Sequence, residues 1–105
     1  MTAKTRKQRF EEMLADAPDD AELRYSLAME YVSEGDDAGA VRIFEEIFRR
    51  NPDYPAAYHM AGRALHRLHR IAEARQVLER GIQAAQKQRD PHAAGEMQEL
   101  LDNLE

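Results

Sequence analysis

Residues 10–14 read Phe-Glu-Glu-Met-Leu and lead to Pro18-Asp19, and the pattern returns at residues 44–48 as Phe-Glu-Glu-Ile-Phe, leading to Pro52-Asp53. The two phenylalanines and the two prolines are each 34 positions apart. A fixed period of this length is typical of solenoids, in which helical hairpins stack on one another. The repeat therefore predicts an all-α fold before any other feature is considered.

The composition excludes several classes of protein. The chain has 105 residues, no cysteine and a net charge of −5. One domain is expected at this length, and disulfides and thiolate metal sites are excluded. The acidic balance argues against general nucleic-acid binding. No stretch approaches the roughly 18 apolar residues that span a bilayer, and the polar start does not resemble a secretory signal. We therefore expect a cytoplasmic protein with no membrane contact.

The periodicity of the apolar residues predicts six helices separated by short turns. The first is expected at about residues 4–16, because Phe10, Met13 and Leu14 form one apolar stripe there. Asp19, with Glu22 three residues later, predicts a capping box that opens the second helix.

Turn residues mark the remaining helix boundaries. Gly35 followed by Asp36 predicts the end of the second helix and the cap of the third. Pro55 suits the first turn of the fourth helix, and Asp90-Pro91 suits the start of the sixth. The turn before the fifth helix contains no glycine. The fifth and sixth helices are expected at about residues 72–88 and 91–104.

On a 34-residue frame the chain resembles the tetratricopeptide repeat family, over roughly residues 6–88. Two full units and a half unit carry the resemblance in one phase. In the first unit the signature positions hold Leu27, Ala28, Tyr31, Ala40, Phe44 and Pro52. In the second they hold Tyr58, Ala61, Gly62, Leu65, Ala74 and Leu78, after which Gly81 and Gln86 depart from the pattern.

The resemblance implies a right-handed α-solenoid of antiparallel helix pairs. Small residues at the helix crossings let the two helices of a pair approach closely. Polar residues on the outer faces of the end helices lead us to expect a finished small domain. The expected organisation is one domain over residues 1–105, with a half repeat at 4–18, repeats at 21–54 and 55–88, and a capping helix at 91–104.

In this family the first helix of each pair lines a concave groove that usually holds the ligand. The residues expected to face the groove are Tyr25, Met29, His59, Arg63, His66 and Arg67. Those on the fourth helix form a basic stripe in an acidic protein, and Arg70 extends it. We therefore expect a non-enzymatic scaffold whose partner is a protein or peptide segment, acidic in character and of unknown identity.

Two alternatives compete with this interpretation. The basic stripe is also consistent with a solvated helix face that pairs with Glu22, Glu30 and Glu34. A structural module that self-associates into a homodimer is a second functional class, with Tyr54 and Met97 as candidate contact points.

Several kinds of chemistry are not expected. Chaperone-binding members of the family clamp a terminal carboxylate with lysine and asparagine, but this chain has tyrosine, methionine, histidine and arginine at those positions. The adjacent glutamates of the two repeated segments point in diverging directions, and there is no glycine-rich phosphate loop. A short basic run at residues 4–9 is expected to serve solubility.

The histidines of the chain are not expected to bind a metal. The chain offers neither a cysteine nor a carboxylate at a matching spacing on the same helix face, so we predict no metal and no cofactor. The four histidines in question are His59, His66, His69 and His92.

Overall fold

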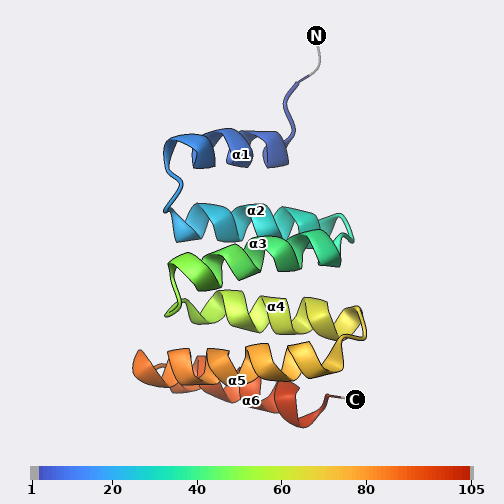
Figure 1. Ribbon diagram of the computed structural model, residues 1–105, viewed down its shortest axis with the longest axis vertical. Helices are drawn as coiled ribbons and strands as arrows, with labels where there is room; N and C mark the ends of the chain where they lie inside the picture. The colour runs from blue at the N-terminus through green and yellow to red at the C-terminus, as the bar shows by residue number, and fades with distance from the viewer. Residues whose placement is uncertain (1–2, 105) are drawn as a thin grey trace.

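The computed structural model describes residues 3–104 as a single stack of helices (Figure 1). Six helices are present within that span. They are α1 (Arg6–Asp16), α2 (Ala21–Ser33), α3 (Asp37–Arg50), α4 (Pro55–Arg67), α5 (Ile71–Lys87) and α6 (Pro91–Asp102). Each helix packs on the next one along the chain, and α6 also touches α4. The predicted all-α architecture of helices packed in pairs is confirmed.

Side-chain caps decide where most of these helices begin. Thr5 and Gln8 form a reciprocal capping box before α1, so this helix starts two residues later than predicted. Asp36 and Asp90 cap α3 and α6 by accepting the N–H of Gly39 at 2.8 Å and of Ala93 at 3.1 Å. Both caps were predicted from the sequence.

The cap of α2 differs from the prediction. Asp20, not Asp19, accepts the N–H of Leu23, at 3.0 Å. Asp20 has the extended backbone that an N-cap requires. The carboxylate of Asp19 instead pairs with Arg50 of α3 at 2.6 Å.

The turns between the helices repeat with the same geometry. Gly35 has a left-handed φ of +78°, and His69, 34 positions later, has a φ of +60°. In both turns the following N–H reaches back to a helical carbonyl at 2.9 Å, Asp36 to Tyr31 and Arg70 to Leu65. The turn without glycine therefore adopts the glycine-type conformation, and α5 begins at Ile71, one residue earlier than predicted.

The core runs along the stack between the two layers of helices. Phe44, Ile47, Leu65 and Leu78 are fully buried. The rings of Phe48 and Tyr58 stack with their centroids 4.2 Å apart and their planes 2° apart, and the Tyr58 hydroxyl donates to the Pro52 carbonyl at 2.8 Å. These side chains tie α3 to α4, and so join one helix pair to the next.

Small residues permit the predicted close approach of paired helices. A Cβ placed on Gly62 would lie 2.5 Å from Cδ2 of Leu78, and one on Gly81 would lie 2.5 Å from Cβ of Tyr58. Real Cβ atoms do not sit this close to other carbons. The α4–α5 pair therefore depends on the absence of side chains at these two positions.

Helix α1 is less buried than α3, the equivalent helix of the next repeat. Met13 of α1 is 54% exposed, whereas Ile47, at the equivalent position of α3, is 0% exposed. The reason is that α3 has helices packed on both sides, while α1 packs chiefly on α2. The predicted apolar stripe of α1 is thus only partly used for packing within residues 3–104.

We expect Gly81→Ala to lower the free energy of unfolding by about 1–3 kcal/mol, because the added methyl group overlaps the backbone-anchored Cβ of Tyr58. Gly95→Ala is the matched control: Gly95 also lies inside a helix, but a Cβ there meets nothing within 4 Å. Alanine should stabilise that helix by about 0.5–1 kcal/mol. Urea unfolding of both variants tests this, and equal stability would contradict the close approach.

Candidate functional site

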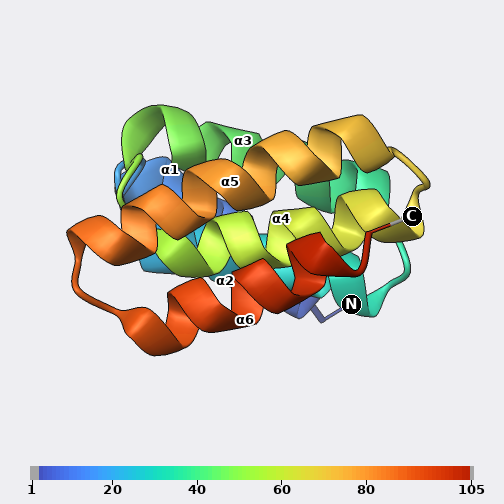
Figure 2. The ribbon, with the colours of Figure 1, turned by 90° about the horizontal axis from the view of Figure 1, so that it is seen from below.

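The helices α2, α4 and α6 lie on one face of the stack, and α1, α3 and α5 lie on the other (Figure 2). The predicted groove residues come from the first face. Tyr25, Met29, His59 and His66 are half-buried, and Arg63 and Arg67 are exposed.

Tyr25 contributes an aromatic ring to the α2 side of this face. Its ring meets Tyr54 edge-on with centroids 5.7 Å apart, and it lies 6.0 Å from the ring of Phe44. Burial raises the pKa of the Tyr25 hydroxyl, and the charge of Arg63 opposes the rise. Tyr25 and Arg63 come from α2 and α4, which lie on the same face of the stack (Figure 2).

Between α4 and α6 the same face contains a polar hollow of 430 Å³. Arg63 is exposed there and makes no ion pair with any residue from 3 to 104. The residues that line the hollow are His59, Arg63, Glu96, Glu99, Leu100 and Asn103.

Burial lowers the pKa of His59 below its ordinary value of 6.5. The carboxylate of Glu96 opposes this shift, and the guanidinium of Arg63 adds to it. His59 is therefore neutral at neutral pH, and the positive charge of the hollow belongs to Arg63.

The acidic residues of α6 are the part of this site that the sequence interpretation missed. The sequence predicts a polar outer face for the last helix, but Glu96, Glu99 and Asn103 of that helix line the hollow together with His59 and Arg63. Their spacing of i, i+3 and i+7 shows that they share one helix face. Aligning Pro91 with Pro55, as the starts of equivalent helices, would have placed Glu99 at the position of Arg63.

The outer part of the predicted basic stripe is engaged elsewhere. Arg67 donates two hydrogen bonds to the carboxylate of Asp37 at the start of α3, at 3.0 and 2.8 Å. These bonds raise the pKa of Arg67. Arg70 pairs with Glu73, one turn further on in α5. Arg67 therefore joins the end of α4 to the start of α3, and Arg70 pairs within the first turn of its own helix. Arg63 is left as the arginine of the stripe without an ion-pair partner among residues 3–104.

Of the three acids predicted as partners of the stripe, Glu30 and Glu34 are paired with other residues, and Glu22 makes no ion pair within residues 3–104. Glu30 pairs with Arg6 at 2.9 Å and Glu34 with Lys7 at 3.4 Å. These contacts join α1 to α2 and use two cations of the N-terminal basic run. Lys4, a third cation of that run, pairs with Glu12 at 2.8 Å.

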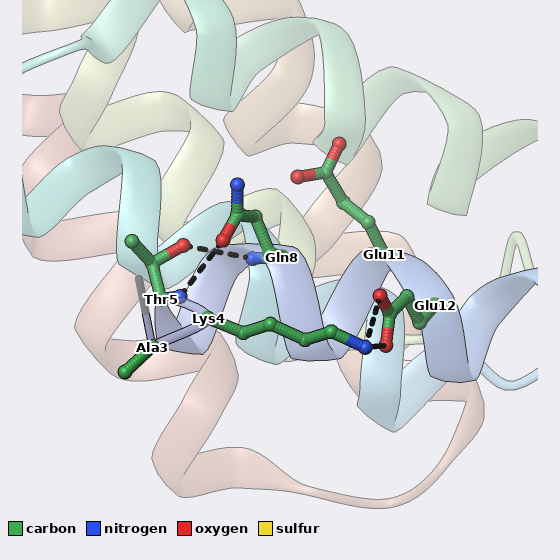
Figure 3. A pocket seen from close by; sticks show the side chains of 6 residues that line it. All are labelled: Ala3, Lys4, Thr5, Gln8, Glu11 and Glu12. Carbon is green, nitrogen blue, oxygen red and sulfur yellow. Dashed lines mark hydrogen bonds and ion pairs between the residues drawn. The ribbon is translucent and has the colours of Figure 1, made fainter. Parts of the chain in front are cut away.

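A second hollow, of 760 Å³, lies beside the start of α1 (Figure 3). It surrounds the capping box of Thr5 and Gln8 and the ion pair of Lys4 with Glu12. Glu11 and Glu12 point in different directions, as predicted (Figure 3). Because its polar groups already serve to cap the helix or to neutralise each other, this hollow is a poor candidate for a binding site.

A third hollow, of 180 Å³, lies on the opposite face between α3 and α5. Ala61 and Leu65 of α4 contribute to its lining. The residues 34 positions earlier are Leu27 and Tyr31, and both are larger. We interpret the hollow as space that the second repeat leaves unfilled at these two positions.

The structure also bears on the contact points proposed for self-association. Met97 is 0% exposed, so its prediction as a contact point is wrong. It lies 36 positions after the buried Ala61, in the same alignment that pairs Pro91 with Pro55. Tyr54 is half-buried against Tyr25. Among residues 3–104 no helix is long and apolar enough to cross a bilayer, and no three metal-ligating side chains gather into a possible metal site.

Comparison with known proteins finds relatives over nearly the whole length. A family model described as tetratricopeptide repeat matches residues 31–97. A repeat-containing protein of Pseudomonas aeruginosa, described by the same family name, is 33% identical over 96 residues, which cover 91% of each chain.

Two solution structures share the fold. A protein from Bordetella parapertussis matches with a TM-score of 0.82 and 29% identity, over 97% of this chain and 89% of that one. A tetratricopeptide repeat domain protein from Salinibacter ruber matches with a TM-score of 0.78 and 30% identity, over 84% of this chain and 89% of that one.

We expect Ala61→Leu to stabilise the protein by about 0.5–2 kcal/mol, because it restores the residue of the first repeat in a hollow that can hold it. Ala57→Leu is the control on the same helix: Ala57 is also 0% exposed but does not line this hollow. The control should lose about 1–3 kcal/mol through overpacking. Thermal unfolding distinguishes the two, and a loss of stability in both variants would contradict the unfilled space.

The lowered pKa of His59 predicts a loss of stability in acid. The unfolded chain binds a proton at His59 more readily than the folded chain does, so stability falls as the pH drops from about 6.5 through the folded pKa. Urea unfolding at about pH 7.5 and about pH 5 should show a smaller loss in His59→Gln than in the parent. If His59→Gln lost as much stability as the parent, this prediction would be wrong.

Proposed function

This chain belongs to the tetratricopeptide repeat family, and on that premise we propose that it binds a segment of a partner protein in the groove formed by α2, α4 and α6. Domains of this family are generally protein–protein interaction modules and are typically non-catalytic. We propose no enzymatic activity and no cofactor.

The observation that carries the proposal is the exposed guanidinium of Arg63. Eight other lysine and arginine side chains within residues 3–104 are held in ion pairs with carboxylates, whereas Arg63 is one of seven that are not. Of these seven, Arg63 lines the hollow shared by α4 and α6, and its charge opposes the rise in the pKa of the Tyr25 hydroxyl. A guanidinium with free donors next to an aromatic ring suits a carboxylate with an apolar neighbour. A peptide segment supplies both groups.

Three further predictions remain proposals. We propose that residues 21–54 and 55–88 act as two repeats of one domain over residues 1–105, with the half repeat 4–18 and the capping helix 91–104 at its ends. Self-association into a homodimer stays an alternative without a defined contact surface. The cytoplasmic location stays a prediction from the sequence.

We expect Arg63→Glu to abolish or weaken capture of the partner from a native lysate. Reversing the charge removes a charge-assisted hydrogen bond and repels the incoming carboxylate, so affinity should fall roughly tenfold to a hundredfold. Isothermal titration with the captured partner measures the change.

Arg75→Glu is the matched control for this experiment. Arg75 is exposed on α5 and, like Arg63, makes no ion pair within residues 3–104. Arg67 is unsuitable for testing binding, because its reversal also breaks the contact with Asp37. If Arg63→Glu and Arg75→Glu bound every partner as the parent does, the groove assignment would fail.

A further inference from the structure

We propose that the segment held in this groove is dipolar: an acidic side chain contacts Arg63 of α4, and a basic side chain about three residues further along contacts Glu99 of α6. The inference rests on the proposed function and specifies the chemistry of the partner. It proposes a partner that carries both charges in place of the acidic partner predicted from the sequence.

The first support is that the hollow between α4 and α6 is lined by side chains of both charges that do not pair with each other. Arg63 and Glu99 both line it, yet they form no ion pair within 4.0 Å. Both side chains belong to exposed residues. A hollow of 430 Å³ separates surfaces that carry opposite charges, and a ligand can bridge them only if it carries both signs itself.

The second support is the balance of charge around the hollow. Arg63 contributes one positive charge, and Glu96 and Glu99 contribute two negative charges. Glu96 lies 3.3 Å from Nε2 of His92, a contact that is an ion pair only when this histidine is protonated, and Glu99 has no ion-pair partner among the described residues. A segment with acidic side chains alone would make a favourable contact with Arg63 but would be repelled by the carboxylates of α6. Like charges brought together at an interface disfavour binding strongly enough to exclude such partners.

The order of the side chains in the segment follows from the order of the helices. Helix α2 offers the aromatic ring of Tyr25, α4 offers Arg63, and α6 offers Glu99. A segment that crosses the three helices in this order therefore presents an apolar, an acidic and then a basic side chain. Neighbouring helices lie about 8–10 Å apart and an extended chain advances about 3.3 Å per residue, which gives the spacing of about three residues.

Two capped peptides of identical composition test the charge order. The first reads Leu-Ser-Ala-Glu-Ser-Ala-Lys, and the second exchanges its Glu and Lys. Each is titrated at low salt into the 15N-labelled protein, and the shifts of the amides of Tyr25, Arg63 and Glu99 are followed. We expect the first peptide to bind roughly fivefold or more tightly than the second, because exchanging the charges turns two attractive contacts into two repulsive ones.

Charge reversal in the protein provides the matched control. The double variant Arg63→Glu/Glu99→Lys should reverse the preference and bind the exchanged peptide more tightly. Glu79→Lys, at an exposed residue of α5 on the other face, should leave the preference of the parent unchanged. A folded double variant with the parent's preference would overturn the inference.

The remaining outcomes separate this inference from the proposed function. Equal binding of both peptides, with shifts at the groove amides, overturns the dipolar order but leaves the groove as a binding site. If neither peptide shifts those amides, the dipolar inference also fails. The proposed function is then judged separately by whether capture of the native partner depends on Arg63.

Discussion

The close approach of α4 and α5 at Gly62 and Gly81 is the constraint on which the rest of the structure depends. With no side chain at either position, Leu78 and Tyr58 fill the crossing directly. Tyr58 then stacks on Phe48 of the preceding pair, so the contact within one pair also positions its neighbour. Because successive pairs are joined in this way, α2, α4 and α6 lie on one face, and side chains from separate helices can form one surface.

The face formed by α2, α4 and α6 shows how a repeated fold acquires a surface of its own. Its regular elements are the helices and their turns, and its distinguishing elements are single side chains. Arg63 and Arg67 lie one turn apart on the same helix, yet Asp37 holds the second, while the first is free. On α6, Glu99 occupies the position equivalent to Arg63. The character of this face therefore changes from aromatic on α2 to basic on α4 and acidic on α6.

Differences between equivalent positions explain the irregular features as well. Ala61 replaces the larger Leu27 and lines an unfilled hollow. His69 replaces Gly35 but keeps the left-handed backbone, because the hydrogen bond from Arg70 to Leu65 closes the turn in the same way. A non-glycine residue in this conformation has a modest energetic cost, which the surrounding helix contacts offset. The backbone geometry of the repeats is thus the same even at positions where the residue type differs between them.

The amino-acid sequence by itself determined the helices, their pairing and most of their boundaries. The signals for these features are local: a 34-residue period, apolar residues at helical spacing, and caps such as Asp36 and Asp90. Only the tertiary structure decided that Asp20 caps α2, that Arg67 forms an ion pair with Asp37, and that Met97 is buried. It also placed Glu99 in the hollow shared with Arg63. Each of these outcomes depends on which distant segments meet, and charge and burial at a residue are set by its neighbours in space rather than by its neighbours along the chain.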